Sequence, residues 1–286
     1  MSQNQLGIIS SRLVALRNHL PSEFARQPRG LKNLKRWKAT ELKQFLLYTG
    51  MSVLKGVVSK ELYNHFLCLT VSISIMLYFK PGEQGYLELF RYAKELLKWY
   101  VNSSPDIYGD TNVSYNVHNL IHLHEDVENQ QCGLESLSAF RFETFLHQIK
   151  KMVRKSHQPI SQITKRISEM QTSNYTLMSK QINTKIQANT KNSRNSWFLL
   201  KNHKICEITR LKGNNQFEAK LYSFNRSLPY FKEPLNSKLL QICFLPKNSI
   251  FIRASIGKND ILKKFALLPE EAGTLLIPML HDLDDL

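Results

Sequence analysis

Apolar residues return at intervals of three and four along the first two thirds of the chain, which is the spacing of one side of an α-helix. The most apolar run, at residues 66–79, is interrupted by Thr70, Ser72 and Ser74 and is too short to span a bilayer, so it predicts a buried helix. The segment 103–110, which contains Pro105 and Gly109, predicts a break in the helical pattern. Helices are expected at residues 5–19, 37–48, 59–79, 85–102, 114–127, 139–155 and 159–185.

The pattern changes after a polar, small-residue segment at 186–196, which has the composition of a linker. Beyond it, short runs rich in β-branched and aromatic residues alternate with turn residues such as those at 212–216. These runs predict a small antiparallel β domain, built as a barrel or a curled sheet. The fold class expected is therefore α+β, divided into helical regions at 1–102 and 103–185, a linker at 186–196 and a β domain at 197–286.

The formal charge of +16 is unevenly distributed. Residues 1–60 carry a net +9, residues 61–140 carry −6, residues 141–212 carry +12 and the remainder carries +1. Blocks of one sign focus potential toward a polyanionic partner. The alternatives are a surface that is charged only for solubility, or an acidic membrane as the partner. A surface charged only for solubility carries positive and negative residues together, whereas residues 144–168 contain no acid. The expected contacts to a phosphate backbone are the cations of that stretch, Lys150, Lys151, Arg154, Lys155, Lys165 and Arg166.

Two histidines stand four residues apart, at His118 and His122. On a helix this spacing puts both imidazoles on one side, within reach of one zinc ion. The pair is weak evidence by itself, because surface or core histidines fall at that spacing by chance and two ligands do not complete a tetrahedral site. The four cysteines lie far apart and supply no paired ligands, and they favour a reducing compartment.

The helix expected at 139–155 carries two distinct faces. Its apolar stripe, expected to be buried, is Phe142, Phe145, Leu146, Ile149 and Val153. A second face combines Glu143 with His147, Lys150 and Arg154. Glu143 has no basic residue three or four positions away, so an ordinary helix ion pair does not account for it. A carboxylate beside cations suits a divalent metal ion acting on phosphates, but a two-metal centre needs about three carboxylates.

Several phrases, in this order, resemble the domain near the end of CACTA (En/Spm-like) DNA transposases: LPSEFARQPRGL (20–31), WKATELKQFLLYTG (37–50), VSKELYNHFLCLTVSISIML (58–77), YNVHNLIHL (115–123) and LSAFRFETFLHQIKKMVRK (137–155). The resemblance covers about residues 20–168 and implies the insertion and last helices of an RNase H-like core with a DDE triad. It implies that Glu143 is the final acid and binds Mg²⁺ or Mn²⁺. It also implies that His118 and His122 are the histidine pair that binds Zn²⁺ shortly before that acid.

The sequence also departs from that family. No Cys-x2-Cys pair precedes the histidines, and the first two aspartates of the triad are not in this sequence. The expectation is therefore a nuclear, transposase-derived DNA-binding protein that is truncated and catalytically incomplete. Its expected partners are DNA and a second copy or a full-length transposase, with no membrane partner. The alternatives are a non-catalytic protein-interaction module, or a nuclease or strand-transferase whose missing acids come from another segment.

Overall fold

A computed structural model describes residues 1–78, 84–172, 193–213 and 215–280. Contacts group them into two compact units. The main unit contains residues 1–134 together with the described residues from 193 onward, and the hairpin unit contains residues 135–172. The protein is α+β, as predicted, with helices followed by an antiparallel sheet. The assignment of the helices to an RNase H-like core stays a prediction, as do the expected domain boundaries.

The helices of the main unit follow the predicted pattern closely at its start. Ser2 and Gln5 form a reciprocal cap at the first helix, and Ile9 and Leu13 are its buried residues. The helix expected at 37–48 is a succession of short α and π turns, and the one expected at 114–127 contains a 3-10 turn at Asn119–His122. The α-helices are α1 (Gln3–Ala15), α2 (Ala39–Gln44), α3 (Gly50–Val53), α4 (Lys60–Leu77), α5 (Gln84–Tyr108), α6 (Tyr115–His118) and α7 (Leu123–Gln130).

Helix α4 is the buried helix that the apolar run at 66–79 predicts. Ser59 caps its start by accepting a hydrogen bond from the backbone N–H of Leu62. The hydroxyls of Thr70 and Ser72 donate to carbonyls one turn earlier, which lets these two polar residues lie inside the core with their hydrogen bonds made. None of the described helices is both long and apolar enough to cross a bilayer.

The helix expected at 85–102 continues as α5 through Pro105 to Tyr108, so its predicted end is wrong, whereas a break does occur within the predicted segment 103–110. Proline removes the backbone donor that would bond the carbonyl of Val101, and in the same turn the hydroxyl of Ser104 donates to the carbonyl of Tyr100 at 2.8 Å. The same carbonyl lies 2.9 Å from Nε2 of the buried His65 on α4. The helix ends instead at Gly109, whose φ of 91° a residue with a side chain rarely adopts.

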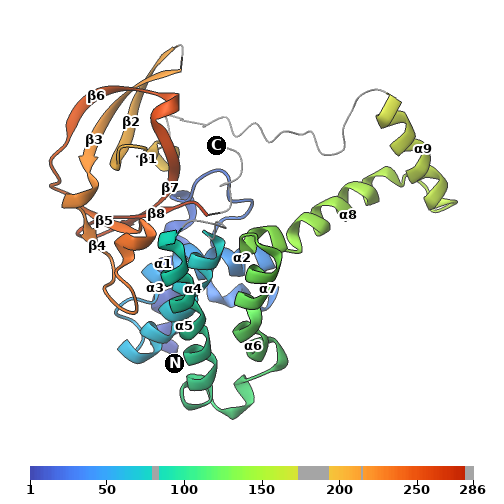
Figure 1. Ribbon diagram of the computed structural model, residues 1–286, viewed down its shortest axis with the longest axis horizontal. Coiled ribbons are helices and arrows are strands. Elements are labelled where there is room, and N and C mark those ends of the chain that lie inside the picture. Colours follow the sequence, from blue (N-terminus) through green and yellow to red (C-terminus); the bar gives the residue numbers. More distant parts are fainter. Residues whose placement is uncertain (79–83, 173–192, 214, 281–286) are drawn as a thin grey trace. The chain divides into compact units, whose positions relative to one another are not determined.

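The C-terminal part forms an antiparallel sheet of eight strands in the described residues, in the order β4-β5-β8-β7-β1-β2-β3-β6 (Figure 1). It confirms the predicted antiparallel sheet, and its curled face encloses a core that includes Trp197, Tyr222, Phe265 and Leu276. The strands are β1 (Trp197–Leu200), β2 (Lys204–Gly213), β3 (Gln216–Ser223), β4 (Leu228–Pro229), β5 (Cys243–Pro246), β6 (Ile252–Gly257), β7 (Ile261–Glu270) and β8 (Gly273–Pro278).

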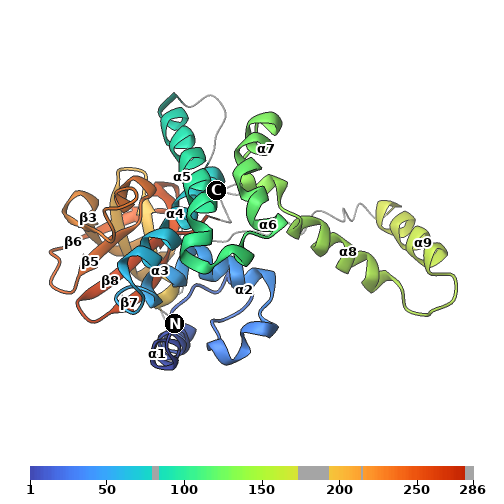
Figure 2. The ribbon, with the colours of Figure 1, turned by 90° about the horizontal axis from the view of Figure 1, so that it is seen from below.

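Helices and sheet pack together within the main unit (Figures 1 and 2). The backbone N–H of Leu280, just past β8, donates to the hydroxyl of Tyr48 at 2.8 Å. On α3, Ser52 donates to Glu270 of β7 at 3.0 Å. Lys55 donates to the carbonyl of Tyr230 at 2.9 Å. The helical segment therefore supports one side of the sheet.

The hairpin unit consists of α8 (Phe140–Met152) and α9 (Pro159–Thr172). The helix predicted at 139–155 ends earlier, because Val153 adopts an extended conformation. The part of the predicted helix 159–185 beyond residue 172 lies outside the described residues.

Candidate nucleic-acid interface

The cations predicted to contact phosphates lie on the hairpin unit and are accessible. Lys150 and Lys151 occupy the last turn of α8, and Lys165 lies on α9. All three are exposed, and Arg166 is half-buried. Arg154 was predicted to lie on the same helical face as Glu143. It lies instead, with Lys155, in the loop between α8 and α9.

Gln162 of α9 fixes the conformation of that loop. Its Oε1 accepts the backbone N–H of Arg154 at 3.0 Å and that of Lys155 at 3.3 Å. Its Nε2 donates to the carbonyls of Lys155 at 2.9 Å and His157 at 2.6 Å. One neutral side chain thus holds the backbone while the two basic side chains remain exposed to solvent.

Glu143 is exposed on the first turn of α8, and among the described residues its side chain forms no ion pair. The apolar stripe predicted to be buried is largely exposed instead. Phe142 is 68% exposed and Leu146 is 62% exposed, whereas Met152 is buried. The physical reason is that a unit of two short helices is too small to bury the apolar sides of both.

His118 ends α6, and His122 lies one turn later in the 3-10 turn, with ring centroids 5.7 Å apart. Nδ1 of His122 lies 3.2 Å from a carboxylate oxygen of Glu125. His124 is turned into the core, where its Nδ1 lies 2.7 Å from the carbonyl of Ile121. The histidine pair belongs to the main unit and Glu143 to the hairpin unit.

The donor atoms do not fit the metals that the family resemblance implies. No group of three His, Cys, Asp or Glu side chains that could hold an ion occurs in the described part of the chain. Two imidazoles leave a tetrahedral zinc site incomplete, and Glu143 alone is too few carboxylates for a two-metal centre. The residues that the structure describes therefore do not form a complete site for Zn²⁺, Mg²⁺ or Mn²⁺.

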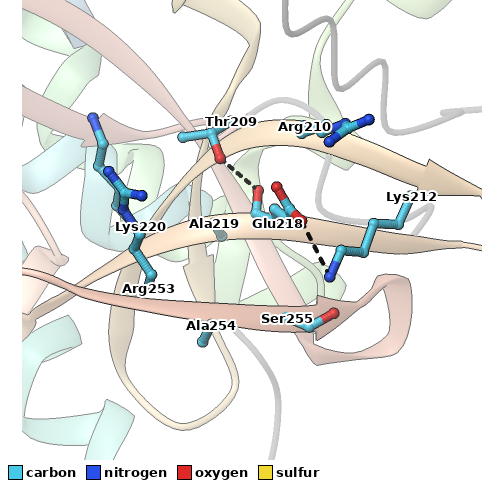
Figure 3. Close-up of a pocket in the computed structure, with 9 residues that line it drawn as sticks. All are labelled: Thr209, Arg210, Lys212, Glu218, Ala219, Lys220, Arg253, Ala254 and Ser255. Carbon is cyan, nitrogen blue, oxygen red and sulfur yellow. Dashed lines mark hydrogen bonds and ion pairs between the residues drawn. The ribbon is translucent and has the colours of Figure 1, made fainter.

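A second basic region, which sequence reasoning did not identify, lies on the sheet. Three adjacent strands, β2, β3 and β6, form a depression with a volume of about 550 Å³, the β groove (Figure 3). Lys220 and Arg253 lie side by side at one end of it, and Arg210 and Lys212 lie at the other. Its lining residues are Thr209, Arg210, Lys212, Glu218, Ala219, Lys220, Arg253, Ala254 and Ser255.

Strand register explains why these side chains gather. Lys220 lies directly opposite Arg253 on β6, and Arg210 on β2 lies directly opposite Glu218. Directly opposed residues project from the same face of a sheet. The pairing of β2 with β3 shifts between Ile208 and Arg210, and a bulge of this kind re-aims the side chains that follow it. Thr209, at this irregularity, donates to the carbonyl of Glu218 at 3.1 Å.

The acidic side chains near the groove are already engaged. Glu218 pairs with Lys212 at 3.2 Å. Glu207 accepts from Lys220 at 3.1 Å and from the hydroxyl of Tyr222 at 3.2 Å. Burial raises the pKa of Tyr222, and the charge of Glu207 and the hydrogen bond to it raise it further, so this hydroxyl stays a donor. Arg210 and Arg253, by contrast, form no ion pair with any described residue.

The sequence carried only a faint signal for the groove. Charged residues alternate with apolar ones in Gln216–Ser223, which is typical of a strand with one polar face. The stretch after residue 212 has almost no net charge, however, so counting along the chain concealed the cluster. Arg253 lies more than thirty residues from Lys220 in sequence, and only the pairing of β3 with β6 brings them together.

No family model matches the chain, and neither the curated proteins nor the solved structures include a significant match.

Proposed function

We propose that the protein is a transposase-derived DNA-binding protein that contacts the phosphate backbone of duplex DNA through the hairpin unit. One observation carries the proposal: residues 144–168 contain six cations and no acid, and five of those cations are exposed. The loop held by Gln162 presents two of them, Arg154 and Lys155. The transposase resemblance of residues 20–168 supports the choice of DNA as the polyanion.

Binding of this kind is driven by the release of counterions from the DNA. Each phosphate neutralised in B-DNA contributes about −0.9 to the slope of log Kobs against log salt concentration. If all six cations make contacts, the slope is about −5, and the affinity depends little on DNA sequence because phosphates carry no sequence information. Charge reversal of two contacting residues removes about −2 from that slope.

The test is fluorescence anisotropy of a labelled duplex over a series of salt concentrations, comparing the full chain with a Lys150→Glu, Arg154→Glu variant. The matched control is Arg91→Glu, Lys98→Glu, which reverses two exposed cations on α5, in the acid-rich part of the chain. We expect the first variant to bind weakly with a flatter salt dependence and the control to change little. Equal slopes for the two variants would refute the hairpin unit as the DNA contact.

A protein-interaction role is the second candidate, and the exposed apolar side of α8 favours it. Phe142 and Leu146 leave this side uncovered within the hairpin unit. The partner in this case is a second copy of the chain, meeting it through the same helix. Sedimentation analysis of the protein and of a Phe142→Ser, Leu146→Ser variant distinguishes the two roles. A dimer that the variant loses while duplex affinity is retained would support interaction rather than DNA binding.

A further inference from the structure

The β groove has the features of a binding site that is separate from the hairpin unit. Its volume of about 550 Å³ lies within the range of roughly 300–1,000 Å³ that ligand pockets occupy. Cations flank the groove at both ends, and between them lie Thr209, two alanine side chains and the carboxylate of Glu218, which is paired with Lys212 (Figure 3). This arrangement suits an elongated ligand that carries negative charge at intervals.

The charge available to a ligand resides in two guanidinium groups. Lys212 and Lys220 are neutralised by Glu218 and Glu207. Arg210 and Arg253 are exposed and have no acidic partner among the described residues. A guanidinium is planar and presents several donors in a fork, so it binds phosphate oxygens in pairs.

An aromatic surface adjoins the groove at its Lys220 end. The ring of Phe251 is 41% exposed, and its centroid lies 5.2 Å from Nζ of Lys220. Behind it, Tyr222 lies 5.7 Å from Phe251, and Trp197 stacks on Tyr222 at 5.6 Å. The buried members of this row hold Phe251 in place, so that a flat apolar ring is presented next to the cations.

We propose that the β groove binds a single-stranded nucleic-acid segment, with a base stacked on Phe251 and phosphates held by Arg210 and Arg253. Cations that follow the backbone, together with an aromatic ring that receives a base, are the combination by which β-sheet domains hold single strands. A duplex keeps the faces of its bases stacked and offers none to Phe251. An acidic peptide would use the arginines but would have no use for a stacking ring.

The test uses the full chain and a fluorescently labelled oligothymidylate of about 12 nucleotides, a length in the range of single-strand sites. All variants carry Lys150→Glu and Arg154→Glu, so that the hairpin unit contributes little. We expect Arg210→Glu, Arg253→Glu to weaken binding at least ten-fold and to flatten the salt slope by about 1.4, at roughly 0.7 per phosphate on a single strand. The matched control is Arg91→Glu, Lys98→Glu, expected to change affinity less than two-fold.

Replacement of the aromatic ring separates a nucleic acid from other polyanions. Phe251→Leu keeps apolar bulk against Tyr222 and should weaken binding by about ten-fold, whereas Phe251→Tyr should bind as the parent does. The proposal is overturned if Arg210→Glu, Arg253→Glu weakens oligonucleotide binding no more than the control does. It is also overturned if Phe251→Leu leaves the affinity unchanged. Displacement of the oligonucleotide by polyglutamate as effectively as by unlabelled oligothymidylate overturns it as well. Duplex binding, measured with the hairpin unit intact, is unaffected by these groove variants, so this site and the proposed function fail independently.

Discussion

Replacement of Tyr48 by phenylalanine tests whether helices and sheet form one cooperative unit. Tyr48 is 1% exposed, and its hydroxyl accepts the backbone N–H of Leu280, which is 3% exposed. Phe24 meets the Tyr48 ring edge-on at 4.9 Å, and this packing survives the change because only the oxygen is removed. The variant therefore removes a buried hydrogen bond between segments that are 232 residues apart.

The expected cost follows from that geometry. The N–H of Leu280 loses a partner that water cannot replace, so its desolvation is uncompensated, and the free energy of unfolding falls by about 1–3 kcal/mol. For a chain of this size each kcal/mol corresponds to roughly 2–4 °C in Tm. The matched control is Tyr115→Phe: Tyr115 is 78% exposed, and its replacement should change stability by less than about 0.5 kcal/mol.

Denaturant unfolding followed by two probes provides the assay. In a background with Trp37→Phe and Trp99→Phe, fluorescence of Trp197 reports on the sheet, while far-ultraviolet circular dichroism reports mainly on the helices. We expect both curves to coincide and to shift together in Tyr48→Phe, because a single unit unfolds in one transition. Separate midpoints for the two probes, or a shift no larger than that of Tyr115→Phe, would show that the two segments are energetically independent.

Three further predictions concern packing, pH and metal. Gly273→Ala should destabilise the protein by about 1–3 kcal/mol in thermal unfolding, because a Cβ there would meet the carbonyl of Leu245 and lie 2.8 Å from the ring of Phe244. Gly7→Ala, with nothing within 4 Å, should instead stabilise α1 by up to about 1 kcal/mol, and the reverse order would contradict this packing. Burial lowers the pKa of His65 below its usual 6.5, although the hydrogen bond to the Tyr100 carbonyl and the charge of Glu61 act in the opposite direction. Neutral His65 therefore contributes to the stability of the folded protein above pH 6.5, and this contribution is lost as the pH falls. Unfolding titrations between about pH 7 and pH 5 should show this loss, and His65→Gln should flatten it; an unchanged pH dependence in the variant would exclude His65 as the cause. Metal analysis should find less than stoichiometric zinc, and one zinc per chain that disappears in His118→Ala, His122→Ala would show that the pair has ligands outside the described residues.

The sequence predicts regular elements best where one residue pattern suffices to form them. Helix α4 follows from its apolar run and from Ser59 at its start, and β3 follows from alternation. The end of α5 was predicted too early, at residue 102, because local rules place a helix end before a proline, whereas α5 contains Pro105 and ends only at Gly109. Strand β7 is harder to recognise from the sequence, because Lys263, Lys264 and Pro269 interrupt its apolar residues. The proline is tolerated where β7 pairs with β8 after its pairing with β1 has ended.

The candidate sites divide in the same way. The basic stretch at 144–168 is contiguous, so its charge and exposure could be predicted from sequence, although the loop conformation of Arg154 depends on Gln162 across the turn. The apolar side of α8 was expected to be buried but is largely exposed. An amphipathic pattern shows which side of a helix is apolar, but it does not show whether another element packs against that side.

The sequence alone determined the α+β class, the order of most elements and the position of the long basic segment, because each depends on residues close together along the chain. The tertiary structure decided which distant residues meet. It placed Arg253 beside Lys220 and joined Tyr48 to Leu280, and it left the histidine pair and Glu143 in different units. The physical reason is that strand register and helix-to-sheet packing minimise the free energy of the whole fold, and no local periodicity records that minimum.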